Sequence, residues 1–400
     1  MRARRPAGHR APGSEGRRVK RTPRVLIAPD TFKGSLTAHE VSLALAAGLQ
    51  EGPGKGAVDC RLLPLADGGD GSVDAALAAG FGRQQISVTG PTGQPVVAAV
   101  AFDGSTAVVE VANSCGLALL SHDELAPLDA SSRGFGEVIL HALALGPRRI
   151  VLALGGSAST DGGMGMLSAL GYTFHDAHGT TLHGNGRALH EIDSVEAPPP
   201  SALANLELVL ASDVRNPLLG PDGAARVFGP QKGAGPEEVS FLEAGLAHLV
   251  DVVEAAGCAS ARAVASAAGS GSAGGLGFAC ALLGARQVSG AEFFLDLLGF
   301  DDASQGCDVI ITGEGSIDEQ TLAGKLPAAV ARRAGVTPVL AVVGRSLLPK
   351  ERWSELPVRS VYALTDYTDQ DSSRDPRLSA ELLRTIGQEI RTTLFLEPMP

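Results

Sequence analysis

A loop suited to binding phosphate follows the apolar run Arg149–Leu154. Residues 155–165 read Gly-Gly-Ser-Ala-Ser-Thr-Asp-Gly-Gly-Met-Gly, and a helix is expected from Met164 to Leu170. A strand that ends in a Gly/Ser-rich loop before a helix binds phosphate in α/β proteins, because backbone N–H groups and the helix N-terminus face the anion. Asp161 is unusual there, since its carboxylate repels a bare phosphate. We therefore expect Asp161 to meet a divalent cation or a substrate hydroxyl group.

Further acidic residues follow apolar runs or lie in Gly-rich loops. They are Asp30, Asp67, Asp70, Asp213 and Asp318, and they are accompanied by Lys33, Lys232 and Lys325. A single Asp in such a loop is usually a helix cap or a turn residue, but six are harder to explain in that way. Carboxylates that hold Mg²⁺, lysines that neutralise charge and an Asp that accepts a hydroxyl proton are the parts of phosphoryl transfer. The residues alone predict an α/β enzyme for a phosphorylated, metal-chelated small molecule.

Other motifs give weaker signals. There is no Walker A sequence, since Gly324-Lys325 is followed by Leu and no Gly lies five residues before Gly324. Residues Gly269–Gly274 match G-x-G-x-x-G, but the preceding Leu246–Ala268 is Ala-rich and predicts a helix, whereas the dinucleotide motif needs a strand. An NAD-dependent oxidoreductase for a small hydroxy acid stays open as an alternative on this motif alone. The cluster His175, His178 and His183 favours a solvated loop over a metal site.

The elements that must position these loops alternate between strand and helix. A strand over Arg24–Ala28 precedes a helix over Ala38–Gln50, which Thr37 and Glu40 start with capping-box spacing. A strand over Val58–Leu65 then leads to a helix over Val73–Ala79. Two successive units of strand, polar loop and helix predict a parallel, doubly wound sheet. Ligands of such sheets bind at the carboxyl ends of the strands, where both loops lie.

The pattern changes after Phe81 and returns near the C-terminus. Short strands are expected at Ile86–Thr89, Val96–Phe102 and Ala107–Val111; later come a strand at Asp308–Thr312, a loop at Gly313–Thr321, a helix from Leu326 and a strand at Pro338–Val343. The predicted fold class is α/β with two domains. A discontinuous Rossmann-like or flavodoxin-like domain with a parallel sheet takes 24–84 plus 286–396, an inserted mixed α/β domain takes 85–285, and 1–23 form a disordered basic extension.

Composition excludes several classes of protein. The 400 residues carry a net charge of −11, but residues 1–21 contribute +7, which leaves −18 on the remainder. An acidic body argues against nucleic-acid binding. No apolar run approaches the ~18 residues of a membrane span, and no signal-peptide core is present. Five dispersed cysteines fit a reducing cytoplasm and no zinc site. We expect a cytoplasmic protein without membrane partners, as a monomer or homodimer.

Six segments in order resemble the bacterial glycerate kinases of the glucarate and glyoxylate pathway type. They read "APDTFKGSLTAHEV", "PLADGGDGSVDA", "LGGSASTDGGMGML", "SDVRNPLLGPDGAARVFGPQKGA", "GSGSAGGLGF" and "ITGEGSIDEQTLAGK", and the resemblance runs from about Val25 to about Leu394. It implies two α/β domains with the active site in the cleft between them. It also implies Mg²⁺-dependent transfer of phosphate from ATP to D-glycerate, with 2-phosphoglycerate favoured over 3-phosphoglycerate as the product.

The resemblance implies charge-based roles for the candidate residues. Asp67, Asp318, Asp213 and Lys33 are the catalytic candidates, and Asp67 and Asp318 are also the candidates for Mg²⁺. Substrate or nucleotide binding is expected from Asp30, Ser35, Gly68, Gly69, Gly155, Gly156, Ser157, Asp161, Gly162, Gly163, Lys232, Gly271, Gly274, Glu314, Gln320, Thr321 and Lys325.

One departure bears on substrate binding. Ser316 stands where the family usually has Arg, whose guanidinium can bind a carboxylate or phosphate through two hydrogen bonds. A serine cannot do so. A relative that binds a carboxylate without catalysis is therefore a further alternative.

Overall fold

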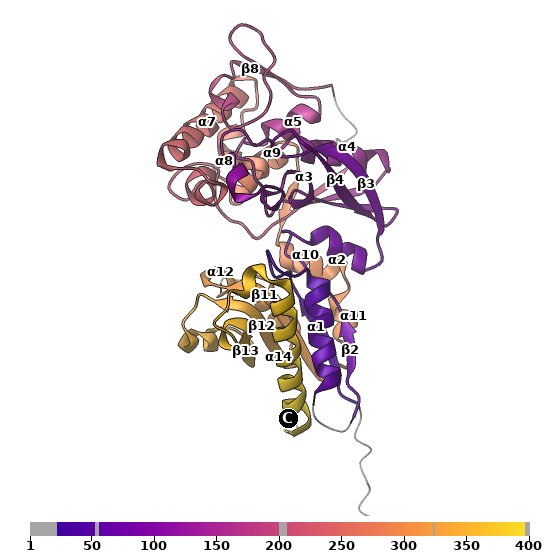
Figure 1. The fold of residues 1–400 in the computed structure, drawn as a ribbon. Helices are drawn as coiled ribbons and strands as arrows, with labels where there is room; N and C mark the ends of the chain where they lie inside the picture. The colour runs from indigo at the N-terminus through magenta and orange to yellow at the C-terminus, as the bar shows by residue number, and fades with distance from the viewer. Residues whose placement is uncertain (1–21, 53–55, 200–205, 323–324, 397–400) are drawn as a thin grey trace, which may run out of the picture.

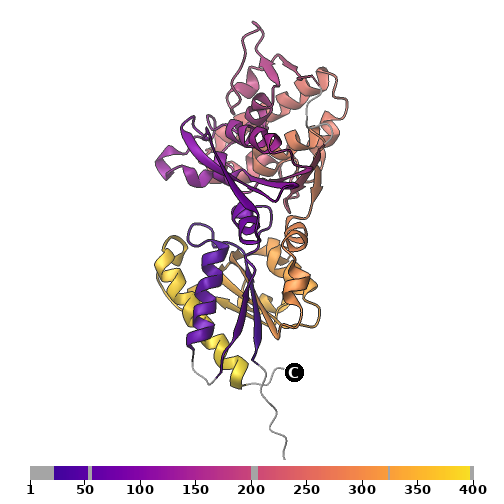
Figure 2. The same cartoon turned by 90° about the vertical axis from the view of Figure 1, so that its right-hand side faces the viewer.

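The computed structural model describes residues 22–52, 56–199, 206–322 and 325–396 as two lobes joined at a narrow waist (Figures 1 and 2). The expected basic extension lies almost wholly outside the described residues. We call residues 24–81 plus 289–396 the parallel lobe and residues 82–288 the mixed lobe, after their sheets. None of the helices in the described ranges combines the length and apolar character that a membrane crossing requires.

The parallel lobe contains a five-stranded sheet in which every neighbouring pair is parallel. Its order is β13 (Ser360–Ala363), β12 (Val339–Ser346), β11 (Val309–Ile317), β1 (Arg24–Pro29) and β2 (Asp59–Leu62). Counted along the chain within this sheet, the order is 2-1-3-4-5, which is the flavodoxin-like order. Ligands of such sheets bind where the strand order reverses, which here is between β1 and β11.

Helices cover both faces of this sheet, and this explains its continuous apolar strands. Val25 and Ile27 of β1 face α1 (Ala38–Glu51) and α14 (Pro376–Leu396), whereas Leu26 and Ala28 face the opposite core. The expected capping box is confirmed, since the Thr37 side chain accepts the Glu40 N–H and the Glu40 side chain accepts that of Thr37. The helices on the opposite face include α10 (Gly290–Leu297) and α13 (Leu326–Arg333); α11 (Phe300–Ser304) and α12 (Glu319–Leu322) connect them to the strands.

The mixed lobe contains the six-stranded sheet. Its order is β10 (Arg286–Val288), β9 (Glu207–Ala211), β6 (Arg149–Ala153), β5 (Thr106–Glu110), β4 (Pro95–Phe102) and β3 (Gly82–Thr89), with β7 (Thr173–His175) and β8 (Ser194–Glu196) as a separate pair. The first four strands are parallel, and β3 and β4 form antiparallel pairs. Its helices are α3 (Ala112–Cys115), α4 (Arg133–Ala144), α5 (Met164–Ala169), α6 (Ala224–Phe228), α7 (Pro236–Ala255), α8 (Ala261–Ser266) and α9 (Leu276–Leu282).

Three expectations on the elements need correction. The Gly-rich segment after Thr312 is not a loop, because β11 continues to Ile317 beside β12. Gly313 permits this, since a Cβ there would lie 1.8 Å from the Val342 carbonyl oxygen. The strand over Val58–Leu65 shortens to β2, and the helix over Leu246–Ala268 divides into α7 and α8. The domain limits stay a prediction, but strand pairing would move them to just before Gly82 and just after Val288.

Two helices lie between the sheets and join the lobes. Apolar residues of α2 (Ser72–Ala78) and α10 pack in one core with Ala101 and Val108 of the six-stranded sheet and with Leu26 of β1. Figure 1 shows α2 and α10 at the waist. The lobes therefore share an apolar core at their junction.

Glycines let backbones touch at this junction. A Cβ on Gly290 would lie 1.8 Å from the Asp67 carbonyl oxygen, and a Cβ on Gly155 would lie 2.4 Å from the Gly69 Cα. Gly68 has φ +86° and lies against the Ala211 carbonyl group. Side chains at these points would push the loops apart.

We expect Gly290→Ala to lower the free energy of unfolding by about 2–3 kcal/mol, because overpacking in a closed site costs about that much. Helix propensity alone predicts a gain of roughly 1 kcal/mol, so the sign of the change separates the two effects. Gly235→Ala, at the residue that precedes α7, is the control for a glycine in open space, since its Cβ would meet only the Glu238 Oε2 at 3.8 Å. Equal urea denaturation midpoints for the two variants would contradict the close contact at Gly290.

Candidate active site

A cavity of about 910 Å³ lies between the lobes. The segments that follow β2, β6, β9 and β10 line it with Asp67–Gly69, Gly155–Ser157, Ser212–Asn216 and Val288–Ser289 respectively. All four segments leave parallel strands at their carboxyl ends, which is where α/β sheets bind ligands. Both lobes therefore contribute to a single cavity.

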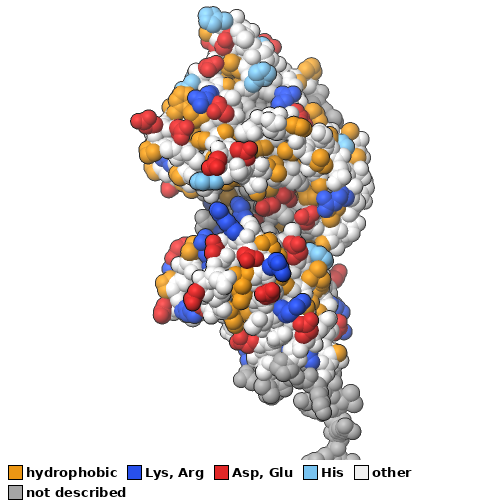
Figure 3. Space-filling model, in the orientation of Figure 1, with side chains coloured by type: hydrophobic (Ala, Val, Ile, Leu, Met, Phe, Trp, Pro, Cys, Tyr) orange, Lys and Arg blue, Asp and Glu red, His pale blue; other side chains and the backbone are white. Residues whose placement is uncertain are grey.

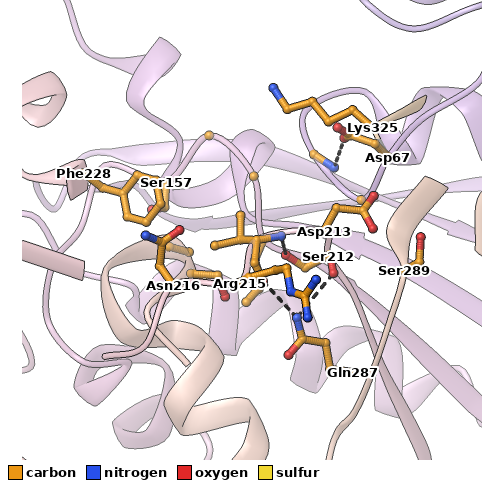
Figure 4. A pocket seen from close by; sticks show the side chains of 18 of the residues that line it. Asp67, Ser157, Ser212, Asp213, Arg215, Asn216, Phe228, Gln287, Ser289 and Lys325 are labelled. Atoms are coloured by element: carbon orange, nitrogen blue, oxygen red, sulfur yellow. Dashed lines mark hydrogen bonds between the residues drawn. The ribbon is translucent and has the colours of Figure 1, made fainter. Parts of the chain in front are cut away.

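Asp67 reaches the cavity from the parallel lobe. Its Oδ1 accepts the Gly69 N–H at 2.9 Å, which bends the loop around the carboxylate. Burial raises the pKa of Asp67, and the nearby negative charge of Asp213 raises it further. Figure 4 shows both side chains at the same cavity. Two carboxylates from opposite lobes thus repel each other where a ligand would bind.

Asp213 reaches the cavity from the mixed lobe and caps a helix of the junction. Its two carboxylate oxygens accept the N–H groups of Gly290 at 3.2 Å and Ala291 at 3.0 Å, at the start of α10. A carboxylate at a helix N-terminus is stabilised by the helix dipole. These two bonds fix the direction in which Asp213 points.

Five cations line the same cavity in a chain that is acidic overall. They are Lys33, Lys232 and Lys325, which the sequence predicted, and Arg215 and Arg332, which it did not. Figure 3 shows basic side chains gathered at the waist of the molecule. The Lys325 Nζ lies 3.5 Å from the Asp318 Oδ2, and Arg332 lies 3.8 Å from Glu292. This local excess of positive charge suits a ligand with several phosphates.

Lys232 is the most deeply buried of these cations, with 2% of its surface exposed. Its Nζ donates to the Ser157 Oγ at 3.0 Å and to the Ser159 carbonyl oxygen. Burial lowers the pKa of Lys232 to about 7, although the charge of Asp161 opposes this shift. A bound anion near Lys232 would therefore stabilise the positively charged form of its amine, which burial alone disfavours.

The loop at residues 269–275 lies beside the loop at 155–165 but does not have the dinucleotide context. It follows helix α8 and not a strand, as expected, and the Gly162 N–H donates to the Gly274 carbonyl oxygen at 3.0 Å. Ala273 lines the cavity with φ +52°, a left-handed conformation that is unfavourable for alanine.

Asp161 has a different place from the one expected. It is fully buried, does not line the cavity, and accepts bonds from the backbone of Ser132, Gly163 and Gly165 and from the Ser132 hydroxyl. These four donors occupy the Asp161 carboxylate, so Asp161 stabilises the loop at 155–165 through internal hydrogen bonds on the side away from the cavity. Gly162 and Gly163 likewise pack against Leu249 and Ala279.

Several other predicted residues lie outside the cavity lining. A polar cluster at the carboxyl ends of the central strands β1 and β11 contains Asp30, Glu314, Asp318 and Thr321. The Ser35 hydroxyl donates to the Ser379 hydroxyl. Gly271 and Gly274 pack against the backbone of the neighbouring loops. Gln320 lies in α12, and its side chain is outside the described residues. Lys33, Asp67–Gly69, Gly155–Ser157, Asp213, Lys232 and Lys325 are the predicted residues that meet at the cavity.

Two carboxyl groups of this cluster, Asp30 and Glu314, have raised pKa values. Burial raises the pKa of Glu314 to about 7, while the Thr321 hydroxyl and Lys325 oppose the shift. Burial and the charge of Asp67 raise the pKa of Asp30 well above its ordinary value. Perturbed carboxyl groups of this kind gather at functional sites.

Sequence reasoning missed part of the lining. Arg215 and Asn216 lie two and three residues after Asp213 in the segment "SDVRNPLL", so the predicted role of Asp213 could have pointed to them. Gln287 gave no such signal. Its Nε2 donates to the carbonyl oxygens of Ser212 at 3.3 Å and Val214 at 3.1 Å and braces the segment that carries Asp213 (Figure 4).

The described residues contain no group of three or more His, Cys, Asp and Glu side chains arranged to hold a metal ion. This is compatible with Mg²⁺, which proteins usually bind through one or two carboxylates together with phosphate oxygens of the substrate.

Comparison with known proteins gives one consistent family. The family model described as the glycerate kinase family matches residues 25–394. A glycerate kinase of Bacillus subtilis strain 168 is 41% identical over 330 residues, and a glycerate 2-kinase of Escherichia coli K12 is 39% identical over 329 residues; each alignment covers 80% of this chain and 85% of the relative. A crystal structure from Salmonella typhimurium LT2, described as a candidate glycerate kinase 2, covers 94% of this chain and 98% of its own, with TM-score 0.73 and 35% identity.

We expect Ala273→Gly to raise the free energy of unfolding by about 0.5–1 kcal/mol, because glycine adopts the left-handed conformation without steric cost. Gly274→Ala should lower it by about 2 kcal/mol or more, since its Cβ would lie 2.2 Å from the Ser159 carbonyl oxygen at φ +67°. Thermal unfolding of both variants measures this contrast. A stabilised Gly274→Ala variant would show that the two loops do not pack as described.

Proposed function

The chain belongs to the glycerate kinase family, and from this premise we propose that it transfers a phosphoryl group from ATP to the 2-hydroxyl group of D-glycerate in the cavity between the lobes. The observation that carries the proposal is the pairing of Asp67 with Asp213 across a cavity lined by five cations. This arrangement suits phosphate groups and a hydroxyl acceptor at once.

The cavity can receive both substrates. Its volume of about 910 Å³ is within the usual range for ligand sites. Leu117, Leu154 and Phe228 supply an apolar part for the adenine ring, and the cations supply the part for the phosphates. The backbone of Gly155 and Gly156, free of side chains, allows close approach of a phosphate.

Asp67 is the group that we assign to the acceptor hydroxyl. Its raised pKa makes the carboxylate a stronger proton acceptor, and its Oδ1 is held by Gly69. Asp67 would orient the hydroxyl of glycerate and accept its proton as the bond to phosphorus forms. Asp318, the other candidate from the sequence, is held by Thr321 and Lys325 behind the cavity and orients Lys325 in this proposal.

Asp213 is the carboxylate that we assign to Mg²⁺. The chemistry of the site fits this ion, since the repelling carboxylates of Asp213 and Asp67 provide oxygen donors beside the positions proposed for phosphate. When bound, Mg²⁺ neutralises charge that develops on the transferred group. Asp213 replaces Asp318 in this role because Asp213 lines the cavity.

The carboxylate of glycerate needs a cation that Ser316 does not supply. The Ser316 Oγ is buried and has no hydrogen-bond partner among the residues that the structure describes, and Ser316 pairs in register with Arg345 of β12. Within the cavity lining, Arg215 and Arg332 offer guanidinium groups from opposite lobes. We propose that one of these two arginines binds the carboxylate of glycerate and that the other binds the phosphates of the nucleotide.

An oxidoreductase finds little support, since the only motif that favoured it follows a helix. Incubation with NADH and hydroxypyruvate should leave the absorbance of NADH unchanged.

Phosphorus NMR identifies the product directly. We expect D-glycerate, ATP and Mg²⁺ to yield ADP and 2-phosphoglycerate in the presence of the protein. A 3-phosphoglycerate signal would correct the assigned hydroxyl group. Absence of any turnover would favour a relative that binds a carboxylate without catalysis.

We expect Asp67→Asn to lower kcat by about 10²–10⁴-fold, because the amide cannot accept the hydroxyl proton. Asp318→Asn is the matched comparison, with an expected loss below about tenfold, since its carboxylate does not line the cavity. Steady-state kinetics at saturating ATP and D-glycerate measure both. An Asp318→Asn loss as large as that of Asp67→Asn would overturn the division of roles.

A further inference from the structure

Glu110 is a buried carboxyl group that the proposed reaction does not use. It ends β5, and only 4% of its surface is exposed. Its Oε2 accepts the Val73 N–H at 2.9 Å, which belongs to the first turn of α2. Since β5 is in the mixed lobe and Val73 is 37 residues earlier in the chain, this bond crosses the junction between the lobes.

The helix that Glu110 holds has no cap of its own. The preceding residue of α2 is Gly71, which has no side chain to accept an N–H group. The apolar face of α2, with Val73 and Ala76, packs in the core between the sheets. Glu110 therefore takes the place of the missing N-cap from the other lobe.

The loop before α2 carries Asp67. The Ser72 hydroxyl donates to the Gly69 carbonyl oxygen at 2.7 Å, and the Gly69 N–H donates to Asp67. A continuous path of hydrogen bonds and backbone thus joins the start of α2 to the carboxylate in the cavity. Displacement of the helix start moves Asp67.

We propose that Glu110 is a positioning residue, which sets the place of Asp67 in the cavity by holding the start of α2 from the mixed lobe. The proposal rests on the role assigned to Asp67 in phosphoryl transfer. Glu110 does not line the cavity and acts only through this path.

The electrostatic surroundings make this hold depend on pH. The carboxylates that act on Glu110 are Asp70 and Asp74, and each has a cation beside it, since Arg83 lies 3.0 Å from Asp74 and the charge of Lys33 lowers the pKa of Asp70. The ion pairs of the described residues do not include Glu110. Burial and, to a smaller extent, the charge of Asp70 together raise the pKa of Glu110 to about 8. The carboxyl group is mostly neutral at pH 6.5 and becomes charged toward pH 9. The N–H groups of Val73 and Gly71 favour the charged form, but burial disfavours it more, so the charge destabilises the packing around the start of α2.

Two variants test the proposal, and both are measured with saturating ATP and D-glycerate. Glu110→Ala removes the acceptor and should lower kcat by about 10–100-fold, with KM for ATP changed less than about threefold. Glu110→Gln keeps an acceptor oxygen and should restore kcat to within about threefold of the wild type at pH 6.5.

The pH dependence of the kcat ratio between Glu110→Gln and the wild type distinguishes a positioning role from a merely structural one. We expect this ratio to rise about tenfold from pH 6.5 to pH 9, because only the wild type acquires the buried charge. Lys232 also loses its charge in this range, but it does so in both proteins and cancels in the ratio. A ratio that stays constant with pH would overturn the proposal.

Glu137→Ala is the matched control. Glu137 also accepts a backbone N–H from a residue distant in sequence, that of Thr89 at 2.7 Å, but it binds no residue of the Asp67–Ser72 loop and does not line the cavity among the described residues. It should lower the melting temperature by a similar amount and leave kcat unchanged. Equal kcat in Glu110→Ala and Glu137→Ala would overturn the proposal.

The Asp67→Asn variant separates this proposal from the proposed function. If Asp67→Asn is inactive while Glu110→Ala is fully active, only the positioning role of Glu110 fails. If Asp67→Asn is active, the role assigned to Asp67 fails.

Discussion

Contact between backbones at the waist is the constraint on which the site depends. Gly68, Gly155 and Gly290 each lie against backbone atoms of another segment, at distances that leave no room for a Cβ. These contacts bring the carboxyl ends of strands from two different sheets to one point. Asp67 and Asp213 face the same cavity only because the segments that carry them can approach this closely.

The junction also uses carboxylates of the mixed lobe to accept N–H groups at the starts of two helices, of which α2 has no side-chain cap of its own and α10 also has the local cap Ser289. Glu110 accepts an N–H group at the start of α2, and Asp213 accepts two at the start of α10. Both acceptors lie at the carboxyl ends of strands in the mixed lobe, and both helices pack in the core between the sheets. The bonds therefore tie secondary structure of one lobe to the sheet of the other, so helix stability and lobe orientation are coupled.

The elements could be predicted where local chemistry decides them. The strand Arg24–Pro29 and the helix begun by Thr37 follow from apolar runs and a capping box that neighbouring residues satisfy. β11 could not be predicted beyond Thr312, because Gly313 lies in a strand only beside the backbone of β12, at the Val342 carbonyl group. Asp161 shows the same limit in the site. Its sequence context suits a ligand contact, and only the packing of Ser132 against the loop reveals that four donors already satisfy it.

Arg215 shows that proximity in space, and not a motif, completes the site. The same segment that presents Asp213 presents Arg215, and Gln287 holds this segment from β10, some seventy residues further along the chain. No periodicity in the sequence links these residues. Their association follows from the parallel pairing of β9 with β10, which places both strand ends at the cavity.

The polar cluster of Asp30, Glu314, Asp318 and Thr321 explains how an acidic protein can present positive charge to phosphate. Lys325 lies 3.5 Å from Asp318 and lowers the pKa of Asp67 and Glu314. If all of these carboxyl groups were ionised, they would cancel the charge of Lys325 toward the cavity. Burial prevents this, because it raises the pKa of Glu314 to about 7 and that of Asp30 well above its ordinary value. The cluster therefore carries less negative charge near neutral pH and screens less of the Lys325 ammonium group from the phosphates.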